Sequence, residues 1–130
     1  MTKPAGRILI VDDEPSLLKM MSVYLRRLGY TVITAGSTEK AWAEMEAAAP
    51  TFAVAVLDAT MNGIPLEDLA AWMLAANPRL CVIAASGYPV DMAPLETSGP
   101  GRVMFLHKPF PPEMLGSAVR RMLATQEEDF

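Results

Sequence analysis

The sequence predicts an α/β fold in which a parallel sheet is covered by helices on both faces. Short apolar runs alternate with amphipathic segments five times along the chain, and strict alternation of this kind is typical of a parallel sheet. Residues 52–57 and 80–85 are apolar without alternation, as expected for strands buried on both faces. The 130 residues, 52% of them hydrophobic, suit one domain with a compact core.

The first two strand–helix units have clear boundary signals. Residues 8–11 are a β-branched-rich strand that ends in acids. Residues 15–28 carry apolar side chains at helical spacing, with proline at the start and glycine after the end. Residues 30–34 predict the second strand, and a second helix begins at Ser37 or Thr38, either of which is suited to cap it.

The remaining three units pair the strands 52–57, 80–85 and 103–106 with the helices 66–76, 90–98 and 111–123. Pro89 and Pro94 interrupt the fourth helix and make it the least regular of the five. Residues 126–130 form an acidic tail that we expect to fray. We therefore expect a single domain over residues 1–130, with its core at about residues 7–124.

Right-handed crossovers leave few ways to wind five such units, and the flavodoxin-like strand order 2-1-3-4-5 is the leading one. We expect Trp42 and Trp72 to pack helices against this sheet, and the single cysteine, Cys81, to be a small buried apolar residue. In sheets of this kind the ligand lies beyond the carboxyl ends of the strands. The residues that follow each strand are therefore the candidates for chemistry.

Polar residues with complementary chemistry stand at four strand ends. Asp12 and Asp13 follow the first strand, Asp58 the third, Ser86 the fourth and Lys108 the fifth. Three clustered carboxylates repel one another, and a hard cation such as Mg²⁺ relieves that repulsion. An aspartate can also attack phosphorus and form an aspartyl phosphate. The metal ion would then hold one phosphoryl oxygen, the ammonium of Lys108 a second, and the hydroxyl of Ser86 a third.

Each of these residues also has a purely structural interpretation. Asp12 and Asp13 suit the first turn of a helix, and Ser86 before Gly87 suits a turn. Lys108 alone would be an ordinary surface lysine. The functional interpretation is favoured because the residues occur together at one predicted edge.

Four segments, ILIVDDEP, VLDATMNG, AASGY and FLHKPF, resemble the motifs of bacterial two-component receiver domains, in the right order and over about residues 7–123. The resemblance implies that Asp58 is the phosphoacceptor. It implies that Asp13 and Asp58 bind Mg²⁺ (or Mn²⁺) directly, Asp12 through water, and Thr60 through its backbone carbonyl.

The resemblance also implies roles for the residues around the phosphoryl group. Lys108 matches the lysine that pairs with the phosphate, and Pro109 the proline that follows it through a cis peptide bond. Ser86 matches the hydroxyl residue that moves toward the phosphoryl group. Phe105 matches the aromatic switch residue, which here would act by packing alone because it has no hydroxyl.

The loop after the third strand departs from the family pattern. Receivers usually carry proline four residues after the acceptor and glycine eight residues after it, whereas this chain has Asn62 and Leu66. The geometry of that loop is therefore expected to be atypical.

The function that follows is a phosphorylatable switch that catalyses only its own phosphorylation and dephosphorylation. A sensor histidine kinase or a histidine phosphotransfer protein would donate the phosphoryl group, and a downstream protein would bind the altered surface. The resemblance allows a homodimer through the fourth helix, fifth strand and fifth helix. Two alternatives are a receiver-like interaction module that is never phosphorylated and an aspartate-nucleophile phosphohydrolase, although the latter class carries an aspartate where this chain has Thr60.

Charge and hydropathy argue against several other classes of function. The formal net charge of −4 favours neither nucleic acid nor an anionic membrane as a direct partner. Neither a signal peptide nor a membrane span is recognisable, which favours the cytoplasm. No output domain is recognisable either. The Met1 start favours a stand-alone receiver over the receiver of a hybrid histidine kinase.

Overall fold

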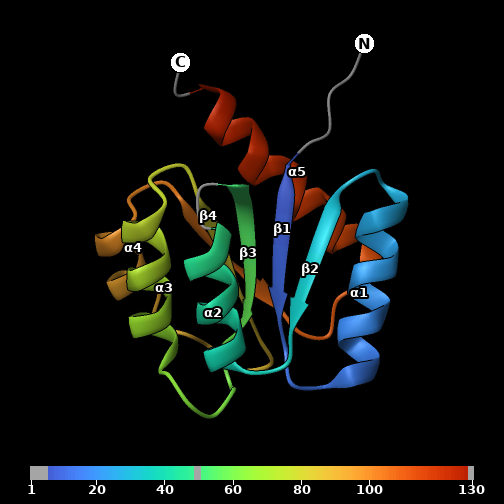
Figure 1. The fold of residues 1–130 in the computed structure, drawn as a ribbon, viewed down its shortest axis with the longest axis horizontal. Coiled ribbons are helices and arrows are strands. Elements are labelled where there is room, and N and C mark those ends of the chain that lie inside the picture. Colours follow the sequence, from blue (N-terminus) through green and yellow to red (C-terminus); the bar gives the residue numbers. More distant parts are fainter. Residues whose placement is uncertain (1–5, 49–50, 129–130) are drawn as a thin grey trace.

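A computed structural model describes residues 6–48 and 51–128 of the chain (Figure 1). The strands are β1 (Arg7–Val11), β2 (Thr31–Ala35), β3 (Phe52–Asp58), β4 (Cys81–Ser86) and β5 (Val103–His107). The helices are α1 (Pro15–Arg27), α2 (Thr38–Ala48), α3 (Leu66–Ala76), α4 (Ala93–Ser98) and α5 (Pro112–Glu128). Every predicted element is present, and most boundaries differ from the prediction by one or two residues.

The five strands form one parallel sheet in the order β2-β1-β3-β4-β5, which confirms the predicted flavodoxin-like winding. Helices α2 and α3 lie in front of the sheet in Figure 1, and α4, at the left margin, packs beside α3 with its Leu95 in the same apolar cluster. Helices α1 and α5 cover the other face. The carboxyl ends of the strands all point to the lower edge in this view. Residues that follow different strands are therefore brought together at that edge.

The core consists of two apolar clusters, one on each face of the sheet. In β1 the side chains of Leu9 and Val11 join the α2–α4 side, whereas Ile8 and Ile10 join the α1–α5 side. This alternation follows from the two-residue period of a strand. Cys81 is fully buried in the α1–α5 cluster, as predicted from the apolar run around it.

The ends of α2 and α4 follow local rules. Ser37 caps α2, because its hydroxyl accepts a hydrogen bond from the backbone N–H of Lys40 at 3.1 Å. Helix α4 spans only Ala93–Ser98 and begins three residues later than predicted. Pro94 then falls in its first turn, where a missing N–H costs nothing.

One further boundary differs from the prediction and one expectation is wrong. Helix α5 continues beyond Leu123 to Glu128, since this part of the chain consists largely of good helix formers; residues 129–130 lie outside the described part. Trp72 is 49% exposed, because the buried stripe of α3 runs through Leu69, Ala70, Met73 and Leu74 and leaves it outside. Its ring lies 5.4 Å from that of Trp42, which is half-buried against the α2–α4 cluster as expected.

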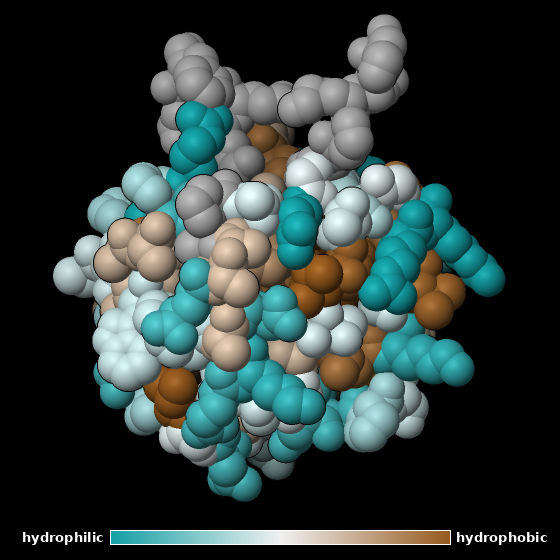
Figure 2. All heavy atoms as spheres, in the orientation of Figure 1, coloured by the Kyte–Doolittle hydropathy of each residue, from teal (hydrophilic) through white to brown (hydrophobic). Residues whose placement is uncertain are grey.

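The surface facing the viewer in Figure 2 is mostly hydrophilic over α2 and α3, with apolar atoms showing over β2, to the right of centre. Strand β2 is an edge strand, and its Ile33 is only partly buried. Within the described residues, no helix is both long enough and apolar enough to cross a membrane.

Candidate functional site

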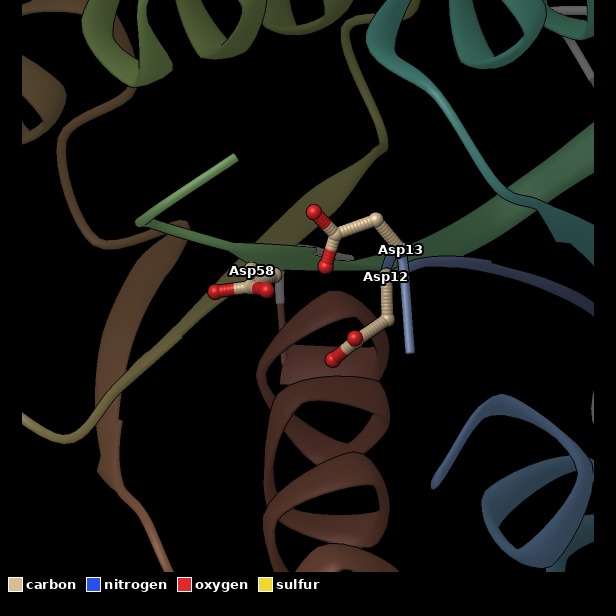
Figure 3. A group of neighbouring side chains, drawn as sticks. All are labelled: Asp12, Asp13 and Asp58. Atoms are coloured by element: carbon tan, nitrogen blue, oxygen red, sulfur yellow. The ribbon is translucent and has the colours of Figure 1, made fainter. Parts of the chain in front are cut away.

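Three carboxylates meet at the carboxyl ends of two neighbouring strands. Asp12 and Asp13 follow β1, and Asp58 is the last residue of β3, which pairs with β1. One oxygen from each of the three lies within 4.8 Å of those from the other two. Figure 3 shows the group, with Asp12 and Asp13 turned to opposite sides of the chain. The predicted acidic cluster is therefore present, with Asp12 and Asp58 buried and Asp13 exposed.

The two buried carboxylates are held in the same way. Oδ1 of Asp12 accepts a hydrogen bond from the N–H of Glu14 at 2.9 Å. Oδ1 of Asp58 accepts one from the N–H of Thr60 at 3.0 Å. Both are local turns in which a side chain binds the backbone two residues ahead. In each case one carboxylate oxygen is fixed by the following turn.

The second oxygen of each buried carboxylate faces Lys108. The Nζ of Lys108 lies 2.9 Å from Oδ2 of Asp12 and 3.5 Å from Oδ2 of Asp58. Burial alone would lower the pKa of Lys108, but the hydrogen bond and charge of Asp12 and the charge of Asp58 outweigh it, so the pKa is raised. The ammonium therefore stays charged at neutral pH.

Of the remaining predicted residues, Ser86 and Pro109 lie at the same edge of the sheet, whereas Phe105 lies in the middle of β5. The Lys108–Pro109 peptide bond is cis, as predicted. The N–H of Lys108 donates to the carbonyl of Ser86 at 2.8 Å, which ties the end of β4 to the segment after β5. The buried hydroxyl of Ser86 accepts a hydrogen bond from the N–H of Tyr88 at 3.0 Å. Phe105 is half-buried, and its ring meets that of His107 edge-on at 6.2 Å between centroids.

Sequence reasoning missed two side chains at this edge. The hydroxyl of Thr60 donates a second hydrogen bond to Oδ1 of Asp58, at 2.9 Å, a contact beyond the predicted role of its backbone carbonyl. The hydroxyl of Thr38, which the sequence suits only to cap a helix, accepts a hydrogen bond from Ile64 in the loop after β3. The first contact was recognisable as a hydroxyl residue two positions after an aspartate, but the second needs the tertiary structure.

The charge balance of the cluster suits a divalent cation. Three carboxylates stand against one ammonium, which leaves two negative charges unmatched. All the side-chain donors are carboxylate oxygens, the ligands that Mg²⁺ prefers. The residues therefore fit the metal that the sequence analysis expected.

An apolar pocket of about 590 Å³ adjoins this cluster between α1 and the segment after β5. Leu17 and Met20 line it from α1, and Pro109 and Phe110 from the opposite side. Lys108 also lines the pocket, so it lies directly beside the carboxylates.

Comparisons with known proteins point to one family. The sequence model of one protein family, the response regulator receiver domain, matches residues 8–120 of this chain. The alginate biosynthesis transcriptional regulatory protein AlgB of Pseudomonas aeruginosa is 30% identical over 94% of this chain, which spans 27% of that protein. The DNA-binding response regulator MtrA of Mycolicibacterium smegmatis is 30% identical over 95% of the chain, which spans 53% of it. The chain thus spans between about a quarter and about half of these relatives.

Solved structures show the same fold. A receiver domain protein of Methanospirillum hungatei superposes with a TM-score of 0.86 at 24% identity, over 96% of this chain and 98% of that one. The receiver domain of the hybrid histidine kinase CckA gives a TM-score of 0.78 at 30% identity, over 91% and 99% of the two chains.

Proposed function

The chain belongs to the response regulator receiver domain family of two-component systems, and from this premise we propose that Asp58 accepts a phosphoryl group from a phosphohistidine. The observation that carries the proposal is the asymmetric setting of the Asp58 carboxylate. Its Oδ1 is held by Thr60, while its Oδ2 lies 3.5 Å from the ammonium of Lys108. A nucleophile held on one side and placed beside a cation on the other is suited to attack a phosphate ester or phosphoramidate.

In the proposed reaction an oxygen of Asp58 forms a bond to phosphorus while the bond from phosphorus to the donor imidazole nitrogen breaks. The imidazole, protonated on its other ring nitrogen, leaves with the electron pair of that bond as a neutral ring. Lys108 would pair with one phosphoryl oxygen, and the hydroxyl of Ser86 would turn from Tyr88 toward another. A bound Mg²⁺ or Mn²⁺, held by Asp12, Asp13, Asp58 and the Thr60 carbonyl, would neutralise part of the phosphoryl charge.

The response of the domain would follow from the charge that phosphorylation adds, about −1.5 to −2 near neutral pH for phosphate esters. Phe105 is half-buried and belongs to neither apolar cluster, so a change in its position would require little repacking of the core. We propose that it turns inward when the hydroxyl of Ser86 moves. The α4–β5–α5 face would then bind a downstream protein or a second copy of the chain.

We propose that the donor, a histidine kinase or a histidine phosphotransfer protein, docks at the apolar pocket between α1 and the segment after β5. The pocket shares Lys108 with the acidic cluster, so a helix bound there would bring its histidine to the carboxyl edge of the sheet, beside Asp58.

The relatives AlgB and MtrA are a transcriptional regulatory protein and a DNA-binding response regulator. We also propose that this chain works in the cytoplasm and does not itself bind nucleic acid, for which its net charge of −4 is unsuited.

Intact mass after incubation with acetyl phosphate and Mg²⁺ tests the proposed function. The wild type should gain one phosphoryl group, and Asp58→Asn should gain none while keeping its thermal unfolding transition. Asp68→Asn, which changes an exposed acid on α3, is the matched control and should react like the wild type. Absence of any gain in the wild type would instead favour the interaction module, and steady release of phosphate from a phosphomonoester would favour the phosphohydrolase.

A further inference from the structure

Thr38, the first residue of α2, has a buried hydroxyl group that binds a segment far along the chain. The residue is 3% exposed. Its Oγ1 accepts a hydrogen bond from the backbone N–H of Ile64 at 3.0 Å, across 26 positions of sequence. The same hydroxyl donates to Oε1 of Glu39 at 3.2 Å. One side chain thus links the start of α2 to the loop between β3 and α3.

The helix itself does not need this hydroxyl. Ser37 already caps α2, because its Oγ accepts the N–H of Lys40 and its carbonyl accepts the N–H of Ala41 at 3.0 Å. The Thr38 hydroxyl is therefore directed to the loop rather than to its own helix.

The backbone conformation of Gly63 allows this contact. Gly63 has a φ of +102°, a left-handed conformation that side chains other than glycine rarely adopt. A Cβ atom at position 63 would also collide with Oγ1 of Thr38 and lie 3.0 Å from Oε2 of Glu39. Glycine is thus required at this position both for its backbone conformation and for the close approach of α2.

The two ends of the loop, residues 59–65, are held by different parts of the fold. The near end is fixed on Asp58 by the two hydrogen bonds of Thr60. The far end is fixed on Thr38 by the N–H of Ile64. Between them, Met61 and Asn62 line an open hollow of about 360 Å³ together with Asp13.

We propose that Thr38 is a positioning residue for the phosphoacceptor site, which holds the loop so that Thr60 keeps its place beside Asp58. This inference rests on the proposed function. The chain lacks the proline and the glycine that the loop usually carries in the family and has Asn62 and Leu66 instead. The hydrogen bond between Ile64 and Thr38 therefore restrains the loop backbone here, in place of a proline with its fixed φ angle.

The test compares Thr38→Val, which removes the hydroxyl, with Thr38→Ser, which keeps it. The control Ser37→Ala weakens the cap of the same helix but leaves the hydrogen bond between Ile64 and Thr38 in place. Three quantities are measured on the full chain: hydrogen exchange of the Ile64 amide without metal, the dissociation constant for Mg²⁺ by calorimetry, and the rate of phosphoryl uptake from acetyl phosphate.

We expect Thr38→Val to speed exchange at Ile64 and to weaken Mg²⁺ binding and phosphoryl uptake about two- to tenfold, the range that the loss of one hydrogen bond corresponds to. Thr38→Ser should behave like the wild type. Ser37→Ala should lower the unfolding temperature while leaving Mg²⁺ affinity unchanged. If Thr38→Val does not fold, Thr38→Ala removes the same hydroxyl with a smaller side chain.

Two results would overturn the inference in distinguishable ways. An active wild type beside a folded Thr38→Val with the same Mg²⁺ affinity and rate would remove the role of Thr38 alone. A wild type that neither binds Mg²⁺ nor takes up a phosphoryl group would remove the proposed function and this inference together.

Discussion

Thr60 donates two hydrogen bonds to a single oxygen of Asp58, one from its backbone N–H at 3.0 Å and one from its hydroxyl at 2.9 Å. The other oxygen of Asp58 faces Lys108. The two oxygens of the proposed nucleophile are therefore not equivalent. A substitution at Thr60 that removes its hydroxyl tests what this hydrogen bond contributes.

Replacing Thr60 by valine should lower the rate of phosphoryl uptake by Asp58 about two- to tenfold. The hydroxyl bond holds Oδ1 of Asp58 and so keeps Oδ2 beside Lys108, whereas valine leaves only the backbone N–H of residue 60 to hold the carboxylate. Intact mass followed over time with acetyl phosphate at saturating Mg²⁺ gives the rate. Thr97→Val, which removes an exposed hydroxyl on α4, is the control. A faster reaction in Thr60→Val would show that the hydroxyl bond mainly weakens the carboxylate as a nucleophile and does not orient it.

Mg²⁺ should raise the thermal stability of the protein because it neutralises the charges of Asp12, Asp13 and Asp58 in the folded state. At a metal concentration 100 times the dissociation constant the gain is about 2.7 kcal/mol. For a chain of this size each kcal/mol raises the unfolding temperature by roughly 3–5 °C. Calorimetric scans with and without the metal measure the shift.

The variant Asp13→Asn tests whether this stabilisation comes from the acidic cluster. Asp13 is exposed and its charge lies close to those of Asp12 and Asp58, so its replacement should leave the metal-free unfolding temperature equal to or slightly above that of the wild type. Most of the Mg²⁺-dependent shift should disappear, whereas Asp68→Asn should keep it. Equal shifts in both variants would place the bound metal elsewhere on the protein.

Lys108 should stabilise the fold up to high pH and lose that effect only under alkaline conditions. Its pKa is raised in the folded state, so the folded protein holds this proton more tightly than the unfolded chain does. The contribution is therefore complete below the unfolded pKa of about 10.4 and declines as pH rises through the folded pKa. Urea unfolding at several pH values between 8 and 11.5, for wild type and Lys108→Met, gives the difference directly.

That difference in unfolding free energy should be constant at the lower pH values and shrink at the upper ones. Lys40→Met, at an exposed position on α2, is the matched control for the loss of one lysine side chain. A difference that grows with rising pH would mean that the pKa of Lys108 is lowered by its burial.

Met20→Glu should slow phosphotransfer from a donor protein about tenfold and leave uptake from acetyl phosphate unchanged. Met20 lines the apolar pocket beside Lys108, and a charge placed there must be desolvated when a partner covers it. The measurement uses a phosphorylated histidine phosphotransfer domain that is active on the wild type. Equal slowing with both donors would mean that the substitution disturbs the site itself rather than docking.

The sheet and the acidic cluster were predictable from short patterns in the sequence. The apolar runs of β3 and β4 have no alternation because both of their faces are covered, and their order along the chain sets the winding. Strand ends of a parallel sheet share one edge, so Asp12, Asp58 and Lys108 could be placed together without coordinates.

The features that sequence reasoning missed depend on side-chain direction and on distant contacts. Trp72 was expected in the core because tryptophan is largely apolar, but its position on α3 decides its exposure. The contact of Thr38 with Ile64 joins segments that no local pattern relates. Arg102, which donates to the carbonyls of Leu74, Asn77 and Leu80 and so closes the end of α3, is a third example.

The division of the core into two clusters affects which amino-acid substitutions must occur together during evolution. Among the described residues, no buried side chain belongs to both clusters, because the sheet separates them. A mutation that alters the shape of α1 or α5 is therefore compensated within its own layer, and the same holds for α2, α3 and α4. The sequences of the α1–α5 layer, which would receive the donor, and of the α2–α4 layer can thus change independently of each other. The residues at the carboxyl edge of the sheet, which the two layers share, would stay the same.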